Sequence, residues 1–381
     1  MKIVYVYPQF ILAAGTERIL IDKMNFLAEQ EEYDISLFTI EQGDNPFVFS
    51  LSPKVKHIDL DVRYCDLYKL NRINRLFKIK KYNRMFQHRY DDEISKINPD
   101  IVITTTYDSR ILSVINNCPI RYKRVLESHI GKRYLHQNDP YNHRNIFSWL
   151  NAYLGMLDVE RQSRKFDVLV ALNQADADDW SKYLRTEVIP NIVHLNPTGR
   201  YSKLDNRQVI FVGRYSKQKG IENLLKIWSV VYEKHPDWHL EMYGTGEQQE
   251  YVLSYVSKNH NNIFVNKPTS NIFEKYTDSS ILLMTSLYEP FGLVIPEAMS
   301  CGLPVVAFDC PYGPGTIITD SYNGFLIAPS NHKQFVDKVC ELMDSYELRK
   351  RMGENAITSS LRYSPNNIMH LWKKLFNDLI S

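Results

Sequence analysis

Two carboxylates lie in an otherwise apolar stretch that should cross between two buried strands. Glu289 and Glu297, separated by seven residues, follow the apolar run Ile281–Met284 and precede the run Val305–Phe308. Both runs are short enough for buried parallel strands. The intervening helix is expected to begin directly after the first glutamate, at Pro290, Phe291 and Gly292. Because phosphates favour the free N–H groups of a helix start, carboxylates beside one are unusual, and we expect a polar ligand to bind here.

Basic residues follow an earlier strand of the same half. The loop after Val209–Val212 carries Arg214 and Lys219 before Gly220, where a helix should begin. Ligands of open parallel sheets bind outside the carboxyl ends of the strands, so both cations should face the same crevice as the helix start near Gly292. A guanidinium offers a fork to phosphate oxygens and an ammonium offers a point charge. The pattern predicts a diphosphate site, and the alternative is a solvated basic turn.

The second half of the chain alternates between strand and helix. Three strands, each followed by a helix, are expected at 209–212, 239–243 and 263–265, ahead of the glutamate stretch. This alternation is typical of a doubly wound parallel sheet and predicts a Rossmann-like domain. The segment YGTGE at 243–247 contains only G-x-G and lacks the third glycine of a nicotinamide fingerprint, so we do not expect a dehydrogenase.

The first half shows the same alternation. Lys2–Tyr7 is predicted to be a strand and Thr16–Ala28 a helix, and further strands are expected at 35–40, 56–60, 98–106 and 166–172. Gly15 stands in the loop before the first helix, where backbone N–H groups could hold a phosphate; an ordinary helix entry is the alternative. His129 follows a strand-like segment, and a lone histidine is either a satisfied structural group or a catalytic one.

Length and local composition divide the chain in two. A chain of 381 residues exceeds the roughly 250 to 300 residues that one hydrophobic core organises. We expect a first domain at residues 1–190 and a second domain at 191–364, with a linker that runs from Val188 to Asn206. A final helix at 365–381 should return to the first domain to bury an apolar stripe. That stripe comprises Ile368, Leu371, Trp372, Leu375 and Phe376.

Asp59 and Asp61 form a D-x-D, a pattern that could hold a divalent metal under a diphosphate. Alternate residues of a strand point to the same face. We therefore expect both carboxylates on the polar face of the strand at 56–60 and no metal site. The core face would be supplied by the flanking residues Ile58, Leu60 and Val62.

The segment Lys69–Arg89 carries eight Lys or Arg residues and no Asp or Glu, with apolar residues interleaved. Such a helix either lies on an anionic membrane surface or packs its apolar stripe on the core and exposes its charges to solvent, and both interpretations stay open. No aromatic platform or known motif accompanies the charge, so we do not expect nucleic acid as a partner.

Composition favours a reducing compartment. The five cysteines are scattered, and none forms a C-x-x-C pair, which fits neither a disulfide framework nor a zinc site. Charged residues at Glu17 and Arg18 interrupt the N-terminal segment before a signal-peptide core could form, and no run of about 20 apolar residues follows. We expect a cytoplasmic protein, associated with the inner face of the membrane if the basic helix binds lipid.

Several motifs of this chain resemble those of the retaining glycosyltransferases of family 4, which have the GT-B fold. The segments that carry the resemblance are VIPNIV at 188–193, VGRYSKQKG at 212–220 and SLYEPFGLVIPEAMSCGLPVVAFDCPYGPGTII at 286–318. The similarity is specific across Val188–Leu326 and weaker before it. It implies two Rossmann-like doubly wound domains facing across a cleft, with the nucleotide-sugar donor in the second and the acceptor in the first.

The resemblance also implies roles for single residues. Glu297 would hold the ribose hydroxyls, and Glu289 a hydroxyl of the donor sugar. Arg214 and Lys219 would bind the diphosphate and stabilise it as it leaves. The remaining implied contacts are the backbone N–H groups of Phe291, Gly292 and Leu293, the loop at Gly15 under the phosphates, and His129 near the reacting carbon.

The sequence departs from the family pattern at three places. Ala14 precedes Gly15 where paired glycines are frequent, Pro290 replaces a frequent glycine, and Ile130 follows His129 where Asp or Asn is usual.

The implied reaction is metal-independent transfer of a hexose or N-acetylhexosamine from a UDP-sugar, without a cofactor. The implied acceptor is a lipid-linked saccharide or a growing surface polysaccharide such as lipopolysaccharide. One alternative is a GT-B relative with other chemistry, a sugar-nucleotide epimerase or a phosphorylase. Another is a non-catalytic sugar-nucleotide-binding partner in a glycan assembly complex, which the joint presence of Arg214, Lys219, Glu289 and Glu297 disfavours.

Overall fold

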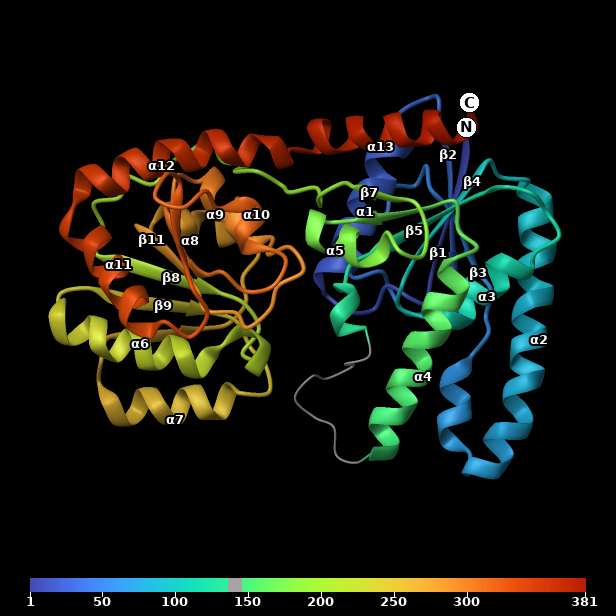
Figure 1. Ribbon diagram of the computed structural model, residues 1–381, viewed down its shortest axis with the longest axis horizontal. Helices are drawn as coiled ribbons and strands as arrows, with labels where there is room; N and C mark the ends of the chain where they lie inside the picture. The colour runs from blue at the N-terminus through green and yellow to red at the C-terminus, as the bar shows by residue number, and fades with distance from the viewer. Residues whose placement is uncertain (136–145) are drawn as a thin grey trace. The chain divides into compact units, whose positions relative to one another are not determined.

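The computed structural model describes residues 1–135 and 146–381, and the chain divides into two compact units (Figure 1). Unit 1 comprises Met1–Ile192 together with Met369–Ser381, and unit 2 comprises Val193–Ile368. Each unit is built on its own parallel sheet with helices packed against it, so the predicted α/β fold class with two parallel-sheet domains is confirmed.

In the described part of unit 1, seven parallel strands form the sheet in the order β3-β2-β1-β4-β5-β6-β7. The strands are β1 Lys2–Tyr7, β2 Asp34–Thr39, β3 Lys56–Asp59, β4 Ile101–Thr105, β5 Lys123–Ser128, β6 Val168–Ala171 and β7 Thr186–Val188. The central strand β4 is buried throughout, which explains why it begins with the apolar run Ile101–Ile103. The strand order reverses between β1 and β4, a position where open α/β sheets bind ligands.

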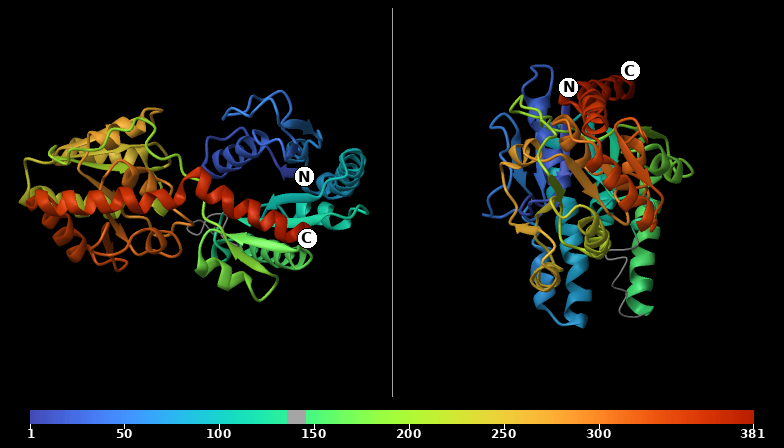
Figure 2. Two further views of the ribbon diagram at one scale, coloured as in Figure 1. Left: turned by 90° about the horizontal axis from the view of Figure 1, so that it is seen from above. Right: turned by 90° about the vertical axis from the view of Figure 1, so that its left-hand side faces the viewer.

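Helices cover both faces of this sheet. They are α1 Gly15–Ala28, α2 Arg72–Ile97, α3 Ser109–Asn117, α4 Ile146–Ser163 and α5 Gln174–Trp180. Residues of α2, α3, α4 and α5 share one apolar core with Val4 and Val6 of β1, whereas α1 lies on the opposite face (Figure 1). Figure 1 and the right-hand view of Figure 2 show that α2 and α4 project past the same end of the sheet.

The described sheet of unit 2 has six parallel strands in the order β10-β9-β8-β11-β12-β13. Its strands are β8 Gln208–Val212, β9 His239–Tyr243, β10 Ile263–Asn266, β11 Ile281–Met284, β12 Val305–Phe308 and β13 Gly324–Ile327. Its helices are α6 Ile221–Lys234, α7 Gln249–Asn259, α8 Ile272–Thr277, α9 Val294–Ser300, α10 Pro314–Ile317, α11 His332–Asp344 and α12 Tyr346–Ser360. The order reverses between β8 and β11, which makes the loops after these two strands the expected walls of a ligand site.

The C-terminal helix, α13 Pro365–Ile380, packs on unit 1 through its second half, as predicted. Its Trp372 ring covers the ammonium of Lys23 in α1 at 4.1 Å from the ring centroid. Four members of the predicted stripe are buried, but Leu371 is 39% exposed, so its assignment to the buried stripe was wrong.

The sequence did not predict two edge strands, β7 and β13. Each has only three or four residues, and β7 lies beside the segment interpreted as a linker, so neither presents an apolar run long enough to stand out. None of the helices in the described residues is long and apolar enough to cross a membrane.

Candidate functional site

The loops after β8 and β11 meet through an ion pair at the point where the strand order of unit 2 reverses. The Lys219 ammonium lies 2.5 Å from Oε2 of Glu289, and the two side chains are 17% and 10% exposed. The hydroxyl of Ser286 lies 3.4 Å from the same carboxylate oxygen. The structure therefore brings together two of the residues predicted for the site, with a cation and a carboxylate largely shielded from water.

Glu289 is held by its backbone. Its carbonyl accepts a hydrogen bond from the Gly313 N–H at 2.7 Å, and its own N–H donates to the Pro311 carbonyl at 3.3 Å. These bonds join the loop after β11 to the loop after β12. The carboxylate is thus carried by a segment that is fixed on both sides, which is what a group recognising a small ligand requires.

The backbone around Lys219 is fixed from the opposite side. Thr285, directly after β11, donates its hydroxyl to the carbonyls of Lys219 and Gly220, both at 3.1 Å. Gly220 has a φ of +65°, and a Cβ on it would lie 2.0 Å from the Thr285 carbonyl oxygen. Only glycine allows this left-handed turn at such close approach, so Gly220 sets the position at which Lys219 leaves the chain.

Arg214 lies in the same loop as Lys219, but its side chain is exposed. The loop is braced by the segment after β9, because the Tyr215 N–H donates to the Thr245 carbonyl at 2.8 Å. A Cβ on Gly244 would lie 1.9 Å from the Gly213 carbonyl oxygen. The G-x-G at 244–246, which we excluded as a nicotinamide fingerprint, therefore serves close packing behind the Arg214 loop.

Glu297 lies within the short helix α9 and is 6% exposed. The Tyr276 hydroxyl of α8 donates to its Oε2 at 3.3 Å. The predicted helix start lies just before α9, and Gly292 adopts a φ of +91° there while its carbonyl accepts from the Ile295 N–H at 2.9 Å. Phe291 is buried against Tyr363, with ring centroids 5.3 Å apart, and Leu293 precedes α9 without a side-chain cap.

In unit 1, Gly15 is exposed and is the first residue of α1, which lacks a side-chain cap at Ala14. The neighbouring Thr16 hydroxyl lies 2.6 Å from the Tyr107 hydroxyl, in the loop after β4. The loops after β1 and β4 thus meet at the switch point of this sheet, as the loops after β8 and β11 do in unit 2.

His129 is buried directly after β5. Its Nε2 lies 3.0 Å from Oε2 of Glu127, and the Lys23 ammonium binds the same oxygen. Burial raises the pKa of the Glu127 carboxyl, but Lys23 and His129 outweigh burial and leave that pKa below its ordinary value. Burial lowers the pKa of Lys23 in spite of Glu127.

The loop after His129 is anchored by Asp176 of α5. Its Oδ1 accepts the Lys132 backbone N–H at 2.7 Å, and the carboxylate is almost fully buried. Burial raises the pKa of Asp176 to about 6, although hydrogen bonds from Ser128 and Lys132 act in the opposite direction. Asp176 therefore changes its charge within a mildly acidic range while holding the loop that carries His129.

Comparisons with known proteins show which proteins this chain resembles. Residues 200–359 match the family model described as Glycosyl transferases group 1. An uncharacterized glycosyltransferase of Haemophilus influenzae is 27% identical over 95% of this chain and 96% of its own length. The amylovoran biosynthesis glycosyltransferase AmsD of Erwinia amylovora is 32% identical over 48% of this chain and 53% of its own length.

A crystal structure of TarM from S. aureus, in complex with Fondaparinux, alpha-GlcNAc-glycerol and UDP, superimposes with a TM-score of 0.75. The superposition covers 99% of both chains at 16% sequence identity, so the similarity shows the fold. This chain is a GT-B glycosyltransferase. The glycosyltransferase carries the ion pair of Lys219 and Glu289 inside the segment that the family model matches.

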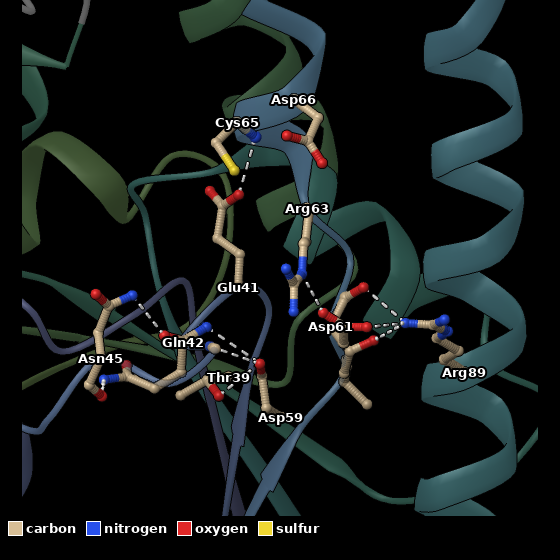
Figure 3. Close-up of polar contacts among 12 residues, drawn as sticks. Thr39, Glu41, Gln42, Asn45, Asp59, Asp61, Arg63, Cys65, Asp66 and Arg89 are labelled. Atoms are coloured by element: carbon tan, nitrogen blue, oxygen red, sulfur yellow. Dashed lines mark hydrogen bonds and ion pairs between the residues drawn. The ribbon is translucent and has the colours of Figure 1, made fainter.

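We had expected the two carboxylates of the D-x-D to lie on one face of the strand. The structure shows that this expectation was wrong (Figure 3). β3 ends at Asp59, and Asp61 adopts a left-handed φ of +50° beyond it. Asp59 accepts hydrogen bonds from the Thr39 hydroxyl at 2.9 Å and the Gly43 N–H at 2.8 Å. Asp61 pairs with Arg63 at 2.6 Å and with Arg89 at 3.6 Å. The expected core face is present, since Leu60 and Val62 are buried.

Sequence reasoning missed the residues that support the site. Thr285 and Gln218 connect the two loops of unit 2, and Ser286 contacts Glu289 within its own loop. In unit 1, Lys23 and Glu127 hold His129. Lys23 lies on the predicted helix Thr16–Ala28, and a lysine is ordinarily solvated. One signal was present: Glu127 follows the apolar residues of a predicted strand and precedes His129 by two residues, so both side chains point to one face of the strand.

Proposed function

We propose that this glycosyltransferase is a retaining, metal-independent enzyme of family 4. It would move a hexose or N-acetylhexosamine from a UDP-sugar to a lipid-linked saccharide or a growing polysaccharide. The observation that carries the proposal is the ion pair of Lys219 and Glu289 at the switch point of unit 2. It places a cation suited to phosphate and a carboxylate suited to hydroxyl groups at one position, and a nucleotide sugar contains both groups.

The donor-binding roles follow from the chemistry of each side chain. The Lys219 ammonium leaves Glu289 for the diphosphate, and Arg214, exposed on the same loop, adds a guanidinium to it. Glu289, released from the ion pair, accepts a hydrogen bond from a hydroxyl of the donor sugar. Glu297, which is buried on α9, accepts hydrogen bonds from the ribose hydroxyls.

The remaining donor contacts come from backbone groups and from unit 1. N–H groups of Phe291, Gly292 and Leu293 add donors for the diphosphate beside α9. Gly15, at the uncapped start of α1, is assigned to the phosphates, and His129 to the donor sugar near the reacting carbon.

The transfer step needs no protein nucleophile in this proposal. The bond between the anomeric carbon and the diphosphate oxygen breaks, and a bond from the acceptor oxygen forms on the same face of the sugar. The acceptor proton passes to the departing phosphate oxygen. Negative charge grows on the diphosphate, and preorganised cations aimed at such a charge supply the largest catalytic stabilisation. Lys219 and Arg214 provide the positive charge that other enzymes take from a metal ion.

The relatives support the choice of donor and acceptor. TarM was crystallised with UDP and a glycosylated glycerol, and AmsD is named for the biosynthesis of a polysaccharide, amylovoran. We extend both properties to this chain: a uridine nucleotide as the leaving group and a glycan as the acceptor.

Donor binding tests the proposal directly. In a thermal-shift panel of UDP-, GDP- and ADP-sugars, we expect stabilisation by UDP-sugars, because a ligand at 100 times its dissociation constant adds about 2.7 kcal/mol to the free energy of unfolding. Product analysis with the stabilising donor and no acceptor should show only slow hydrolysis. Rapid turnover to an isomeric sugar nucleotide would indicate an epimerase and contradict the proposal, as would the absence of stabilisation by any UDP-sugar.

We also propose that unit 1 contacts an anionic membrane through the Lys69–Arg89 segment, which includes the first part of α2. The described residues Lys78, Lys80, Lys81 and Arg84 are exposed, and Phe77 is 79% exposed. The neighbouring projecting helix α4 adds an exposed apolar stripe at helical spacing, formed by Leu150, Tyr153, Leu154 and Leu157. Positive charge and insertable apolar side chains together are what stable peripheral binding requires.

Vesicle sedimentation tests this membrane contact. Binding should rise as phosphatidylglycerol replaces phosphatidylcholine and should fall in a variant with Lys78→Gln, Lys80→Gln and Lys81→Gln. The matched control is Lys350→Gln with Arg351→Gln, which neutralises exposed cations on α12 of unit 2. Equal binding to neutral and anionic vesicles would refute the membrane contact.

A further inference from the structure

Three ionisable side chains form a buried chain in unit 1, on the face of the sheet covered by α1 and α13. Lys23 is 1% exposed, Glu127 is 3% exposed and His129 is 6% exposed. The Glu127 Oε2 atom is hydrogen-bonded to the Lys23 ammonium and also to the His129 Nε2, which lies 3.0 Å away. Burying an ion pair costs several kcal/mol per ion, and apolar residues of similar volume are often as stabilising. Stability alone therefore does not account for the burial of Lys23, Glu127 and His129 together.

The direction of the hydrogen bonds determines the state of the His129 ring. An ionised carboxylate only accepts hydrogen bonds, so the His129 Nε2 must carry the proton that it shares with Glu127. Its Nδ1 is then left on the opposite side of the ring. A second group that fixes the tautomer and orientation of a histidine is a recurrent arrangement in catalytic sites.

Lys23 keeps Glu127 in the form that this arrangement needs. A carboxylate as buried as Glu127 would otherwise take up a proton, because burial favours its neutral form. The Trp372 ring covers the Lys23 ammonium at 4.1 Å, and the Tyr5 ring lies at 5.8 Å on the same cation. Both aromatic faces hold the ammonium next to Glu127 while they exclude water.

We propose that Glu127, kept ionised by Lys23, is a positioning residue that fixes the tautomer and ring orientation of His129 for its contact with the donor sugar. This inference rests on the proposed function, because it assigns Glu127 a role through a histidine whose own role belongs to that proposal. Lys23 and Trp372 act one and two contacts further from the reacting atoms.

Two double variants separate positioning from charge balance. Lys23→Met with Glu127→Gln removes both charges but leaves an oxygen that accepts the His129 Nε2 proton. Lys23→Met with Glu127→Leu removes both charges and the acceptor. We expect both variants to fold with similar melting temperatures, because neither leaves an uncompensated buried charge. The Gln variant should keep kcat within about threefold of the wild type, and the Leu variant should lose at least about tenfold in kcat with little change in donor KM.

A double-mutant cycle adds the test of mechanism. If Glu127 acts through His129, the loss caused by Lys23→Met with Glu127→Leu should shrink to within about twofold when His129→Ala is already present. Equal kcat in the Gln and Leu variants, or a full additional loss in the His129→Ala background, would overturn the proposal.

Nitrogen-15 NMR of the wild-type histidines gives an answer even if the Leu variant does not fold. With the signals assigned by their loss in His129→Gln, the His129 Nε2 should have the shift of a protonated nitrogen. An unprotonated Nε2 would refute the proposed positioning. If the wild type transfers no sugar at all, the proposed function fails while this NMR result still decides whether Glu127 fixes the His129 tautomer.

Discussion

At the residue scale, Lys219 and Glu289 each determine what the other can bind. In the structure they neutralise one another at 2.5 Å, so neither presents a net charge to solvent. A diphosphate competes for the lysine and a sugar hydroxyl replaces it at the glutamate, which couples recognition of the two halves of a nucleotide sugar. A ligand that supplies only one of these groups leaves the other residue with an unpaired, largely buried charge, which is costly.

These two residues could be predicted from sequence because parallel strands present their following loops at one edge of the sheet. The role of Lys23 could not be predicted, because its ion pair with Glu127 joins residues 104 positions apart, on a helix and a strand. The D-x-D prediction failed for a local reason: β3 ends at Asp59, and Asp61 turns out of the strand to reach Arg63 and Arg89.

Asp176 provides a residue-scale prediction of pH dependence. Its pKa of about 6 in the folded chain lies above the ordinary value of 3.8, so the folded state binds more protons between these values. Stability from this residue is therefore fully present at low pH and is lost as the pH rises from about 4 to about 6, by roughly 3 kcal/mol.

Urea unfolding at several pH values measures this effect. The difference in unfolding free energy between the wild type and Asp176→Asn should fall across that range, because the amide keeps the acceptor for the Lys132 N–H but cannot ionise. The control is Asp178→Asn, an exposed carboxylate on the same helix, which should leave the pH dependence unchanged. If the difference in unfolding free energy between the wild type and Asp176→Asn does not vary with pH, the raised pKa of Asp176 is contradicted.

At the element scale, the site of unit 2 depends on loops that support one another from three strands. The loop after β11 fixes Lys219 through Thr285, and the segment after β9 braces the Arg214 loop through Thr245. The central strands of this unit, β8, β11 and β12, were predicted to within one residue because their apolar runs are continuous. The contacts made by Thr285 and Thr245 were not predicted, because they depend on how closely two backbone segments approach each other.

Gly244→Ala tests the bracing of the Arg214 loop. The added Cβ would meet the Gly213 carbonyl oxygen at 1.9 Å, so the backbone must shift. We expect a loss of roughly 1 to 3 kcal/mol in unfolding free energy, typical of overpacking, and weaker donor binding because Arg214 moves with the loop.

Gly155→Ala is the matched control, because a Cβ there meets nothing within 4 Å. Gly155 lies in the interior of α4, where alanine is favoured by about 1 kcal/mol, so this variant should be neutral or more stable. Unchanged stability and donor affinity in Gly244→Ala would show that the G-x-G segment does not brace the site.

At the scale of the whole molecule, the last helix ties the C-terminus of the chain to its first unit. Met369–Ser381 belong to unit 1 although they follow all of unit 2 in the sequence. Trp372 is 2% exposed over Lys23, and Lys373 pairs with Glu32 at 3.1 Å. The apolar stripe predicted that this helix is buried, whereas the buried lysine beneath it was not foreseeable from helical spacing.

Trp372→Ala should destabilise unit 1 and spare donor binding. Removing a buried tryptophan costs about 3 to 5 kcal/mol, and it also uncovers the Lys23 ammonium. Chemical unfolding should show this loss. The dissociation constant for UDP should stay within about twofold of the wild-type value, because the side chains that we assign to UDP all lie in unit 2.

Leu371→Ala is the control on the same helix, because Leu371 is 39% exposed and its removal should cost well under about 1 kcal/mol. Similar losses in both variants would contradict the packing of α13 described above.

The most direct measurement of the central claim is the rate of sugar transfer from the UDP-sugar identified by thermal shift. We predict that Lys219→Ala and Glu297→Ala each lower kcat/KM at least about 100-fold, equivalent to about 2.7 kcal/mol of transition-state stabilisation. Lys217→Ala, an exposed lysine of the same loop, should transfer at close to the wild-type rate. Near-normal transfer by both Lys219→Ala and Glu297→Ala would contradict the assignment of the donor site to unit 2.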